Sequence, residues 1–352
     1  MKDRTLVGAS AQLRIEGRTM KTDVRTAGLG RTGARAQIVL AVLWTAFVVA
    51  ALLLMDVLQD ARFGVVVLAS GGALAVASAM IPRFRGSVAW LRRRADARDL
   101  LVVASLYFAV VGLLRLAFSG FTTDNMLWFF LTFAAALLLG VGGPVLYQVG
   151  IRGGVLADLG IGVRRWRSTV VLGLLFAGVQ FSITLLGYDL PRPVDWIPVV
   201  ALALAVGLFE AVFFRGFIQG RLEASFGAVP AVVGAAALYG LYHVGYGMDG
   251  SEMFFLFSLG IVYAVAYRLT ENVLVLWPLL TPLGYLFAEL EAGDMRGELP
   301  WASMAGFGDV LGLMVLILWL AHRRERKRRG QSVTTLSKPT EALRPRDSVM
   351  IG

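Results

Sequence analysis

Apolar residues along this chain are gathered into long continuous runs separated by short polar segments. Ten of these runs are long enough, or nearly so, to cross a hydrocarbon core of about 30 Å. They cover residues 38–58, 63–81, 100–118, 126–147, 168–187, 197–219, 229–246, 253–267, 273–290 and 301–321. Lipid offers no partner for backbone polar groups, so each run is predicted to form a helix. The pattern therefore predicts an all-α, polytopic transmembrane helix bundle of about ten spans.

The polar segments alternate in charge, and this alternation predicts the orientation of the helices. Segment 82–99 is rich in arginine, whereas segments 119–125 and 248–252 contain neither Lys nor Arg. Segment 148–167 is basic again, and the last span is followed by the basic run 323–329. Because positive charges favour the cytoplasmic side of a membrane, both chain ends are predicted to be cytoplasmic.

The same pattern divides the chain into four parts. Residues 1–37 are polar and rich in arginine, and we expect a disordered cytoplasmic tail there. Residues 38–150 are predicted to form four leading transmembrane helices, and residues 151–322 a six-helix membrane core. Residues 323–352 are predicted to be a basic cytoplasmic tail, whose positive charges would attract anionic lipid headgroups.

Composition supports the membrane assignment and excludes several kinds of site. Hydrophobic residues make up 57% of the chain and charged residues 16%, with a mean hydropathy of +0.70. The net charge of +10 arises from basic residues in the segments between spans, so we expect no nucleic-acid partner. The chain has no Cys and only two histidines, His243 and His322. We therefore expect no disulfide, no cofactor and no zinc site, which requires three or four protein ligands.

Ionisable or strongly polar side chains inside the predicted spans are the candidate functional residues, because placing them in lipid is costly. Arg115 lies near the end of its span, where its long side chain can reach the headgroups. Gln180 and Asp309 can serve a polar pathway or form hydrogen bonds between helices, and the second interpretation is favoured. Glu210 is different, because it lies near the midplane of the bilayer, and His243 is in the following helix.

Glu210 and His243 permit two interpretations. If both side chains face inward from adjacent antiparallel helices, together they can hold and activate a water molecule. They can equally be a buried hydrogen-bonded pair that fixes helix packing. By rise per residue His243 is about 10 Å nearer the outer face, an offset that helix tilt or a break at Pro230 would have to close.

Two short motifs carry a family resemblance. The segment Glu210-Ala-Val-Phe-Phe-Arg215-Gly216 resembles the E-E-x-x-x-R-G signature of the CPBP family, the CAAX proteases and bacteriocin-processing enzymes. Tyr239-Gly-Leu-Tyr-His243 is similar to the second signature, an aromatic residue followed four positions later by His. Segment 158–162 is similar to the lead-in of the family core, and the resemblance covers roughly residues 155–290. It implies an intramembrane endopeptidase in which Glu210 and His243 activate water, supported by Arg215 and Tyr239.

The chain departs from the family pattern at two places. The second Glu of the first signature is Ala211 here. The third signature, H-x-x-x-N, which steadies the oxyanion in the family, has neither its His nor its Asn in segment 277–285. Thr281 and Tyr285 are the candidates for a substitute oxyanion donor. Loss of one such donor typically slows a reaction by about 10²–10³-fold.

Helix geometry gives an interpretation of Ala211. Residues four apart share one face of an α-helix, so a Glu at position 211 would pair with Arg215. In an α-helix Glu210 and Arg215 are about 140° apart and are predicted to serve different faces. Without a Glu at position 211, Arg215 must find another acceptor or reach lipid phosphates.

Three functions remain open from the sequence. The first is a CPBP-type intramembrane endopeptidase of the bacterial inner membrane, which acts on a peptide or membrane-protein substrate among membrane lipids. The second is a catalytically inactive relative that serves as a membrane scaffold or immunity factor. The third, a transporter, is disfavoured because we find no inverted repeat. For the enzyme, close helix packing around a hydrated cavity is expected at a set of glycines: Gly140, Gly142, Gly143, Gly216, Gly220 and Gly240.

Overall fold

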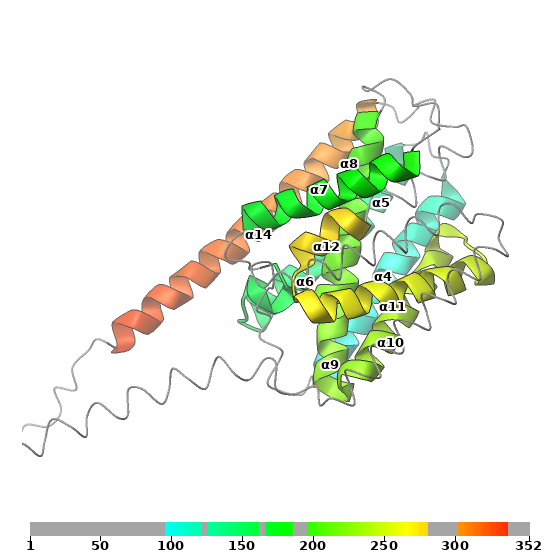
Figure 1. Ribbon diagram of the computed structural model, residues 1–352. Helices are drawn as coiled ribbons and strands as arrows, with labels where there is room; N and C mark the ends of the chain where they lie inside the picture. Colours follow the sequence, from blue (N-terminus) through cyan, green and yellow to red (C-terminus); the bar gives the residue numbers. More distant parts are fainter. Residues whose placement is uncertain (1–95, 122–125, 162–165, 186–195, 281–300, 337–352) are drawn as a thin grey trace, which may run out of the picture.

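A computed structural model describes residues 96–121, 126–161, 166–185, 196–280 and 301–336 (Figure 1). Within these ranges the chain is all-helical and contains no strand. The N-terminal elements are α4 (Ala97–Gly120), α5 (Met126–Phe133), η2 (Ala134–Gly142), α6 (Gly143–Val145), η3 (Leu146–Ile151) and η4 (Leu156–Leu159). The later elements are α7 (Trp166–Leu185), α8 (Trp196–Glu210), η6 (Ala211–Gln219), α9 (Gly220–Phe226), α10 (Ala228–Tyr242), η7 (His243–Tyr246), α11 (Gly250–Thr270), α12 (Val273–Leu280) and α14 (Trp301–Leu336).

Five of the described helices are long and apolar enough to cross a membrane. They are Ala97–Gly120, Leu127–Ile151, Ala203–Phe226, Ala228–Tyr246 and Gly250–Thr270. Each coincides with a span predicted from the sequence. The first two predicted spans, 38–58 and 63–81, lie outside the described residues. The count of about ten spans and the cytoplasmic placement of both ends therefore stay predictions.

Several helix starts follow from local side-chain chemistry. α4 begins with a capping box, in which the Asp96 side chain accepts from the Asp99 amide and the Asp99 side chain accepts from the Asp96 amide. α11 begins with a second one, built by Asp249 and Glu252. Hydrogen bonds from the Ser251 hydroxyl and from backbone amides lower the pKa of the Asp249 carboxyl. Both caps satisfy backbone amides that a helix start leaves without partners.

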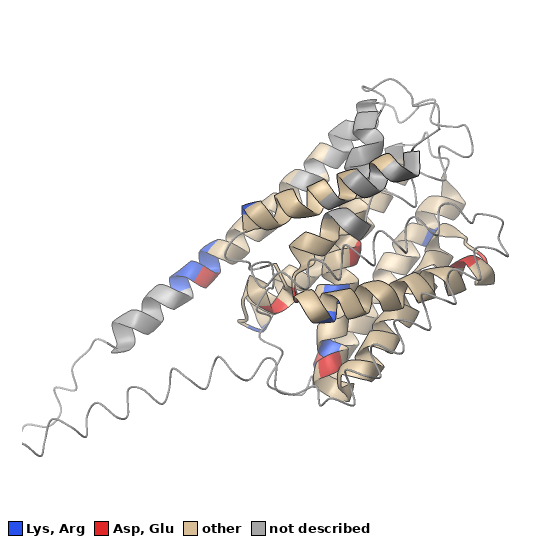
Figure 2. Ribbon diagram, in the orientation of Figure 1, with Lys and Arg blue, Asp and Glu red and all other residues tan. Residues whose placement is uncertain are grey.

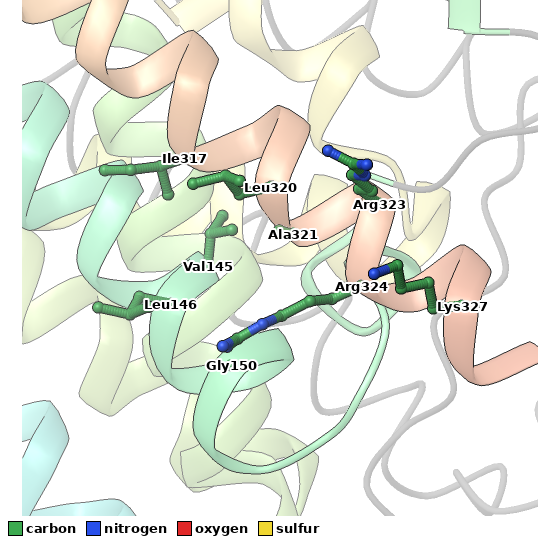
Figure 3. A pocket seen from close by; sticks show the side chains of 9 residues that line it. All are labelled: Val145, Leu146, Gly150, Ile317, Leu320, Ala321, Arg323, Arg324 and Lys327. Atoms are coloured by element: carbon green, nitrogen blue, oxygen red, sulfur yellow. The ribbon is translucent and has the colours of Figure 1, made fainter.

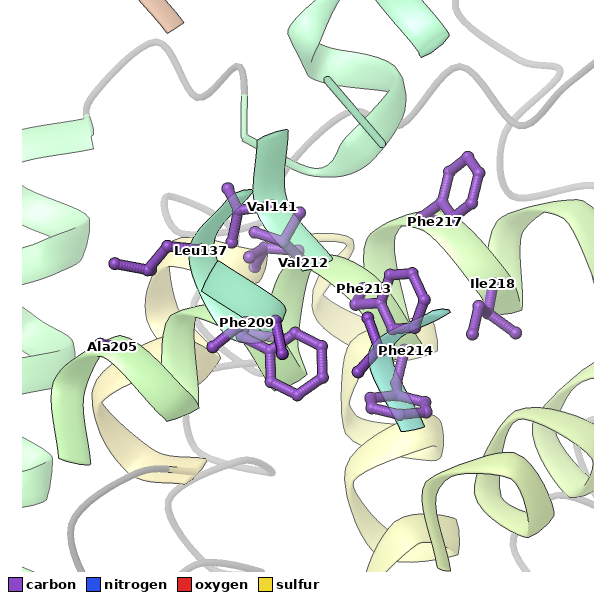
Figure 4. Packing of buried hydrophobic residues seen from close by; sticks show 14 of the residues in the cluster. Leu137, Val141, Ala205, Phe209, Val212, Phe213, Phe214, Phe217 and Ile218 are labelled. Atoms are coloured by element: carbon purple, nitrogen blue, oxygen red, sulfur yellow. The ribbon is translucent and has the colours of Figure 1, made fainter. Parts of the chain in front are cut away.

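The centre of the bundle is a layer of aromatic rings on the continuous helix α8–η6. The Phe209 and Phe213 rings stack with centroids 5.5 Å apart, and Phe213 and Phe217 continue the row at 6.2 Å. Figure 4 shows Leu137 and Val141 of η2 beside the Phe209 end of this row. A Cβ at Gly140 would overlap the Phe209 ring, so this glycine allows η2 to pack directly on α8.

Helices from the predicted leading part and from the predicted core share this one hydrophobic cluster. The Tyr107 hydroxyl of α4 donates to the Leu238 carbonyl of α10 at 3.1 Å. On the other side of the bundle, the Trp277 indole N–H of α12 donates to the Leu204 carbonyl of α8 at 2.7 Å. Helix α8–η6 is thus enclosed by neighbours, and residues 209–221 are all buried.

A connected set of polar side chains joins the start of α4 to η3, to η4 and to the start of α9. We call it the Asp99 cluster, and its members are Asp99, Tyr147, Gln148, Arg152, Asp158 and Arg221. Asp99 accepts from the Tyr147 hydroxyl and from Arg152, both at 2.6 Å. Gln148 donates to Asp158 at 2.7 Å and accepts from Arg221. Burial lowers the pKa of Arg152, but the combined attraction of Asp99 and Asp96 raises it above its ordinary value.

Candidate active site

Glu210 is the last residue of α8, and only 6% of its surface is exposed. The Tyr242 hydroxyl donates to Oε1 of Glu210, and the Tyr239 hydroxyl donates to Oε2 at 3.2 Å. Both tyrosines come from α10, which runs beside α8–η6. A buried carboxylate is tolerated only where it finds such donors or a counter-charge. Two tyrosines therefore hold Glu210 in place.

His243 directly follows α10 and is 5% exposed. Its Nδ1 lies 2.9 Å from the Tyr239 carbonyl oxygen. Because a carbonyl oxygen can only accept, Nδ1 must carry the proton in this contact. In the neutral ring, Nε2 then has a free lone pair and can accept a hydrogen bond. The backbone of α10 thus selects the tautomer that a water-orienting histidine requires.

Tyr239 connects Glu210 to His243. Its hydroxyl contacts the carboxylate of Glu210, and its carbonyl contacts the imidazole of His243. Among the described residues no hydrogen bond joins Glu210 and His243 directly. The depth offset estimated from helix rise does not prevent both residues from contacting Tyr239. We call Glu210, Arg215, Tyr239, Tyr242 and His243 the Glu210 cluster.

The prediction that Glu210 and Arg215 serve different faces of the helix is wrong. Residues 211–219 form a π-helix, whose hydrogen bonds run from residue i to i+5, rather than the α-helix that the estimate assumed. Residues five apart therefore come to the same side. The Arg215 guanidinium lies 4.9 Å from the centre of the Tyr239 ring, whose hydroxyl contacts Glu210. Tyr239 is thus a neighbour of both residues.

Arg215 has a local environment that is rare for a cation. Arg215 is 0% exposed, and its Nε, Nη1 and Nη2 have no hydrogen-bond partner among the residues that the structure describes. Ala211, at the position of the family's second Glu, is also fully buried and offers no acceptor. The guanidinium is stabilised by the face of Tyr239 and by its electrostatic attraction to Glu210. Of the two alternatives predicted for Arg215, another acceptor is absent from the described part of the chain. Contact with lipid phosphates would need an exposed guanidinium, whereas Arg215 is fully buried.

Gly216, next to Arg215, packs against Leu159 of segment 158–162, the segment that is similar to the lead-in of the family core. A Cβ at Gly216 would overlap the carbonyl group of Leu159, so only glycine lets η4 pack against η6 at this point. A Cβ at Gly240 would come within 2.7 Å of the Met253 carbonyl oxygen, which makes it a second close approach. A Cβ at Gly220 would meet no atom of a neighbouring element within 4 Å, so the expectation of close packing at that glycine is wrong.

The sequence analysis did not select Tyr242 as a site residue, although the Tyr242 hydroxyl donates to Glu210. The signal was present, because Tyr239 and Tyr242 are three residues apart and share one helix face next to His243. The predicted substitute donors Thr281 and Tyr285 lie outside the described residues. Within the described ranges no three His, Cys, Asp or Glu side chains come together in a way that would hold a metal ion.

Comparison with known proteins identifies one segment of the chain. The family model described as Type II CAAX prenyl endopeptidase Rce1-like matches residues 191–279. No curated protein and no solved structure gives a significant match. The matched segment contains both motifs, Glu210 to Gly216 and Tyr239 to His243. The recognition made from these motifs is therefore confirmed, and the chain carries an Rce1-like segment consistent with a CPBP family protein.

Proposed function

We propose that this protein is an intramembrane endopeptidase of the CPBP type, located in the bacterial inner membrane. The observation that carries the proposal is the joint contact of Glu210 and His243 with Tyr239, inside a buried site in the Rce1-like segment. The all-helical fold and the five apolar helices support an integral membrane protein. The substrate would be a peptide or membrane protein that reaches this site from the surrounding lipid.

The proposed reaction is hydrolysis of a peptide bond by an activated water molecule. Glu210 takes a proton from water while Nε2 of His243 accepts the second hydrogen bond and orients the oxygen. The water oxygen forms a bond to the carbonyl carbon, the carbon–nitrogen bond breaks, and the proton on Glu210 passes to the leaving amine. For this step one tyrosine hydroxyl must release Glu210, so that an oxygen atom becomes free to accept from water.

Negative charge on the carbonyl oxygen needs a stabilising group, because the third family motif lacks its His and Asn. Thr281 and Tyr285 remain the candidates proposed from the sequence. Arg215 adds a positive charge to the Glu210 cluster, and its three guanidinium nitrogens have no acceptor in the part of the chain that the structure describes. The positive charge of Arg215 could therefore stabilise negative charge that develops on a substrate bound at the Glu210 cluster.

A second candidate is a catalytically inactive membrane scaffold or immunity factor. One observation favours it, because both oxygens of Glu210 are already engaged by tyrosine hydroxyls and are satisfied without water. On this alternative the Glu210 cluster fixes helix packing and binds a partner without hydrolysis.

Proteomics of membrane-protein termini separates the two candidates. Cells that express the wild-type chain should show new termini that are absent with Glu210→Gln and with His243→Ala. Tyr107→Phe removes a buried hydroxyl outside the Glu210 cluster and serves as a matched control, which should leave the termini unchanged. Identical termini in wild-type and Glu210→Gln cells, with both proteins present at equal levels, would reject the endopeptidase and leave the scaffold.

A further inference from the structure

A groove lies where α14 leaves the helix bundle, far from the Glu210 cluster in the sequence. Helix α14 packs along η2, α6 and η3 and then extends beyond the rest of the bundle (Figure 1). The groove has a volume of about 480 Å³, within the range of small-molecule and cofactor sites. Figure 3 shows the residues that line it: Val145, Leu146, Gly150, Ile317, Leu320, Ala321, Arg323, Arg324 and Lys327.

The lining separates into an apolar part and a cationic end. Val145, Leu146, Ile317 and Leu320 form apolar walls, and Leu146 and Leu320 are about half exposed. Arg323, Arg324 and Lys327 stand at one end, and no carboxylate is among the lining residues. Figure 2 shows Lys and Arg gathered on the stretch of α14 that leaves the bundle, with one acidic residue, Glu325, among them. An occupant would therefore meet apolar surface along one part of its length and positive charge at its end.

Two of the three cations are available to a ligand. The Arg323 guanidinium lies 5.2 Å from the centre of the Trp319 ring, which already gives it a partner. Arg324 reaches back toward η3, and its Nη1 lies 3.7 Å from the position that a Cβ of Gly150 would take. Because Gly150 has no side chain, it leaves room for the Arg324 side chain beside η3. In the described part of the chain neither Arg324 nor Lys327 forms an ion pair.

We propose that this groove binds one anionic phospholipid. The acyl chain lies between η3 and α14 against the apolar walls, and the headgroup phosphate contacts Arg324 and Lys327. Charge complementarity selects an anionic lipid over a zwitterionic one, because the lining gives the phosphate two cations and contains no carboxylate. Two juxtaposed apolar helix surfaces that end in cations match the amphipathic shape of a lipid better than that of a soluble anion.

Native mass spectrometry of the full chain in detergent tests this site directly. With phosphatidylglycerol, one lipid should stay bound at low lipid concentration, and phosphatidylcholine should bind at least tenfold more weakly. Arg324→Gln should weaken binding of phosphatidylglycerol by about fivefold, the value expected for one interfacial charge. Lys327→Gln should do the same, and it provides an independent comparison if one variant does not fold.

Arg326→Gln is the matched control, because Arg326 is an exposed cation of the same run and does not line the groove. It should change phosphatidylglycerol binding by less than about twofold. Equal losses in Arg324→Gln and Arg326→Gln would show diffuse attraction to the basic run and would overturn the proposal. Inorganic phosphate should not displace the lipid, and complete displacement would instead identify a site for a soluble anion.

Discussion

Arg215 and Arg221 lie on one continuous helix, and their side chains are 0% and 1% exposed. Arg221 belongs to the Asp99 cluster, where it donates to Gln148 and lies 4.3 Å from the centre of the Phe217 ring. Arg215 belongs to the Glu210 cluster, and within the described ranges none of its three nitrogens has a hydrogen-bond partner. The same helix therefore carries one buried cation within a hydrogen-bonded network and one outside any network.

This difference separates a structural site from a candidate functional one. Buried polar groups in folded proteins are nearly always hydrogen-bonded, so an unpaired buried guanidinium requires a specific explanation. The Asp99 cluster has acids, amides and cations in mutual contact, which is typical of a network that fixes helix packing. In the Glu210 cluster, the carboxylate and the guanidinium are adjacent to one tyrosine but do not pair with each other. A substrate or water could complete this arrangement.

The largest expected effect is an all-or-none difference in cysteine labelling between the two ends of the bundle, which face opposite sides of the membrane in the predicted orientation. The Phe118 and Tyr246 rings, 4.8 Å apart, place the end of α4 beside η7 and opposite the Asp99 cluster. Because the chain has no Cys, single cysteines can be labelled without background. Ser119→Cys and Ser251→Cys should react with a membrane-impermeant thiol reagent in intact cells, whereas Phe226→Cys and Arg326→Cys should not. All four positions are exposed, and a swapped result would invert the predicted orientation.

The next effect is a loss of stability in the Asp99 cluster. Asp99→Ala removes the acceptor of the Tyr147 hydroxyl and of Arg152. We expect a loss of about 2–3 kcal/mol, below the full value for a broken buried pair because Arg152 is partly exposed and can reach water. Thermal unfolding in detergent, followed by tryptophan fluorescence, measures it. Asp249→Ala, at an exposed cap, should cost clearly less, and equal losses would contradict a structural role for the Asp99 cluster.

A gain in stability is expected from Ala211→Glu. The new carboxylate stands four residues before Arg215 and gives its buried guanidinium an acceptor. Relief of an unpaired buried charge outweighs the strain of a larger side chain, so we expect a net gain of about 1 kcal/mol. Ala211→Gln has nearly the same volume and no charge, and it should be less stable than Ala211→Glu. Equal stability of the two variants would mean that Arg215 does not need a partner.

The smallest effect is expected for the stability of Glu210→Gln. The amide keeps one oxygen that accepts from a tyrosine hydroxyl, and its NH₂ group can donate to the other tyrosine. The variant should therefore unfold within about 1 kcal/mol of the wild type, while the proposed hydrolysis is lost. A loss as large as that of Asp99→Ala would assign Glu210 the same structural role as Asp99.

The sequence alone predicts the helices well, because lipid permits few alternatives for a long apolar run. It also identifies Glu210 and His243, since ionisable residues at membrane depth are rare. It does not reveal the π-helix at residues 211–219, because no local residue pattern distinguishes i→i+5 from i→i+4 hydrogen bonding. This is why the faces of Glu210 and Arg215 were assigned wrongly. Arg221 and Asp99 were missed because they lie just outside the predicted apolar spans 197–219 and 100–118, where charged residues are usually solvated.

The central claim is that Glu210 and His243 belong to one site, and a double-cysteine crosslink tests it most directly. Glu210→Cys/His243→Cys should react in native membranes with a short bifunctional thiol reagent and give an internal crosslink. Glu210→Cys/His322→Cys is the control and should not crosslink, because His322 is an exposed residue on α14. A crosslink in the first variant alone is the predicted result. Its absence in folded protein would contradict the shared site and, with it, the proposed hydrolysis.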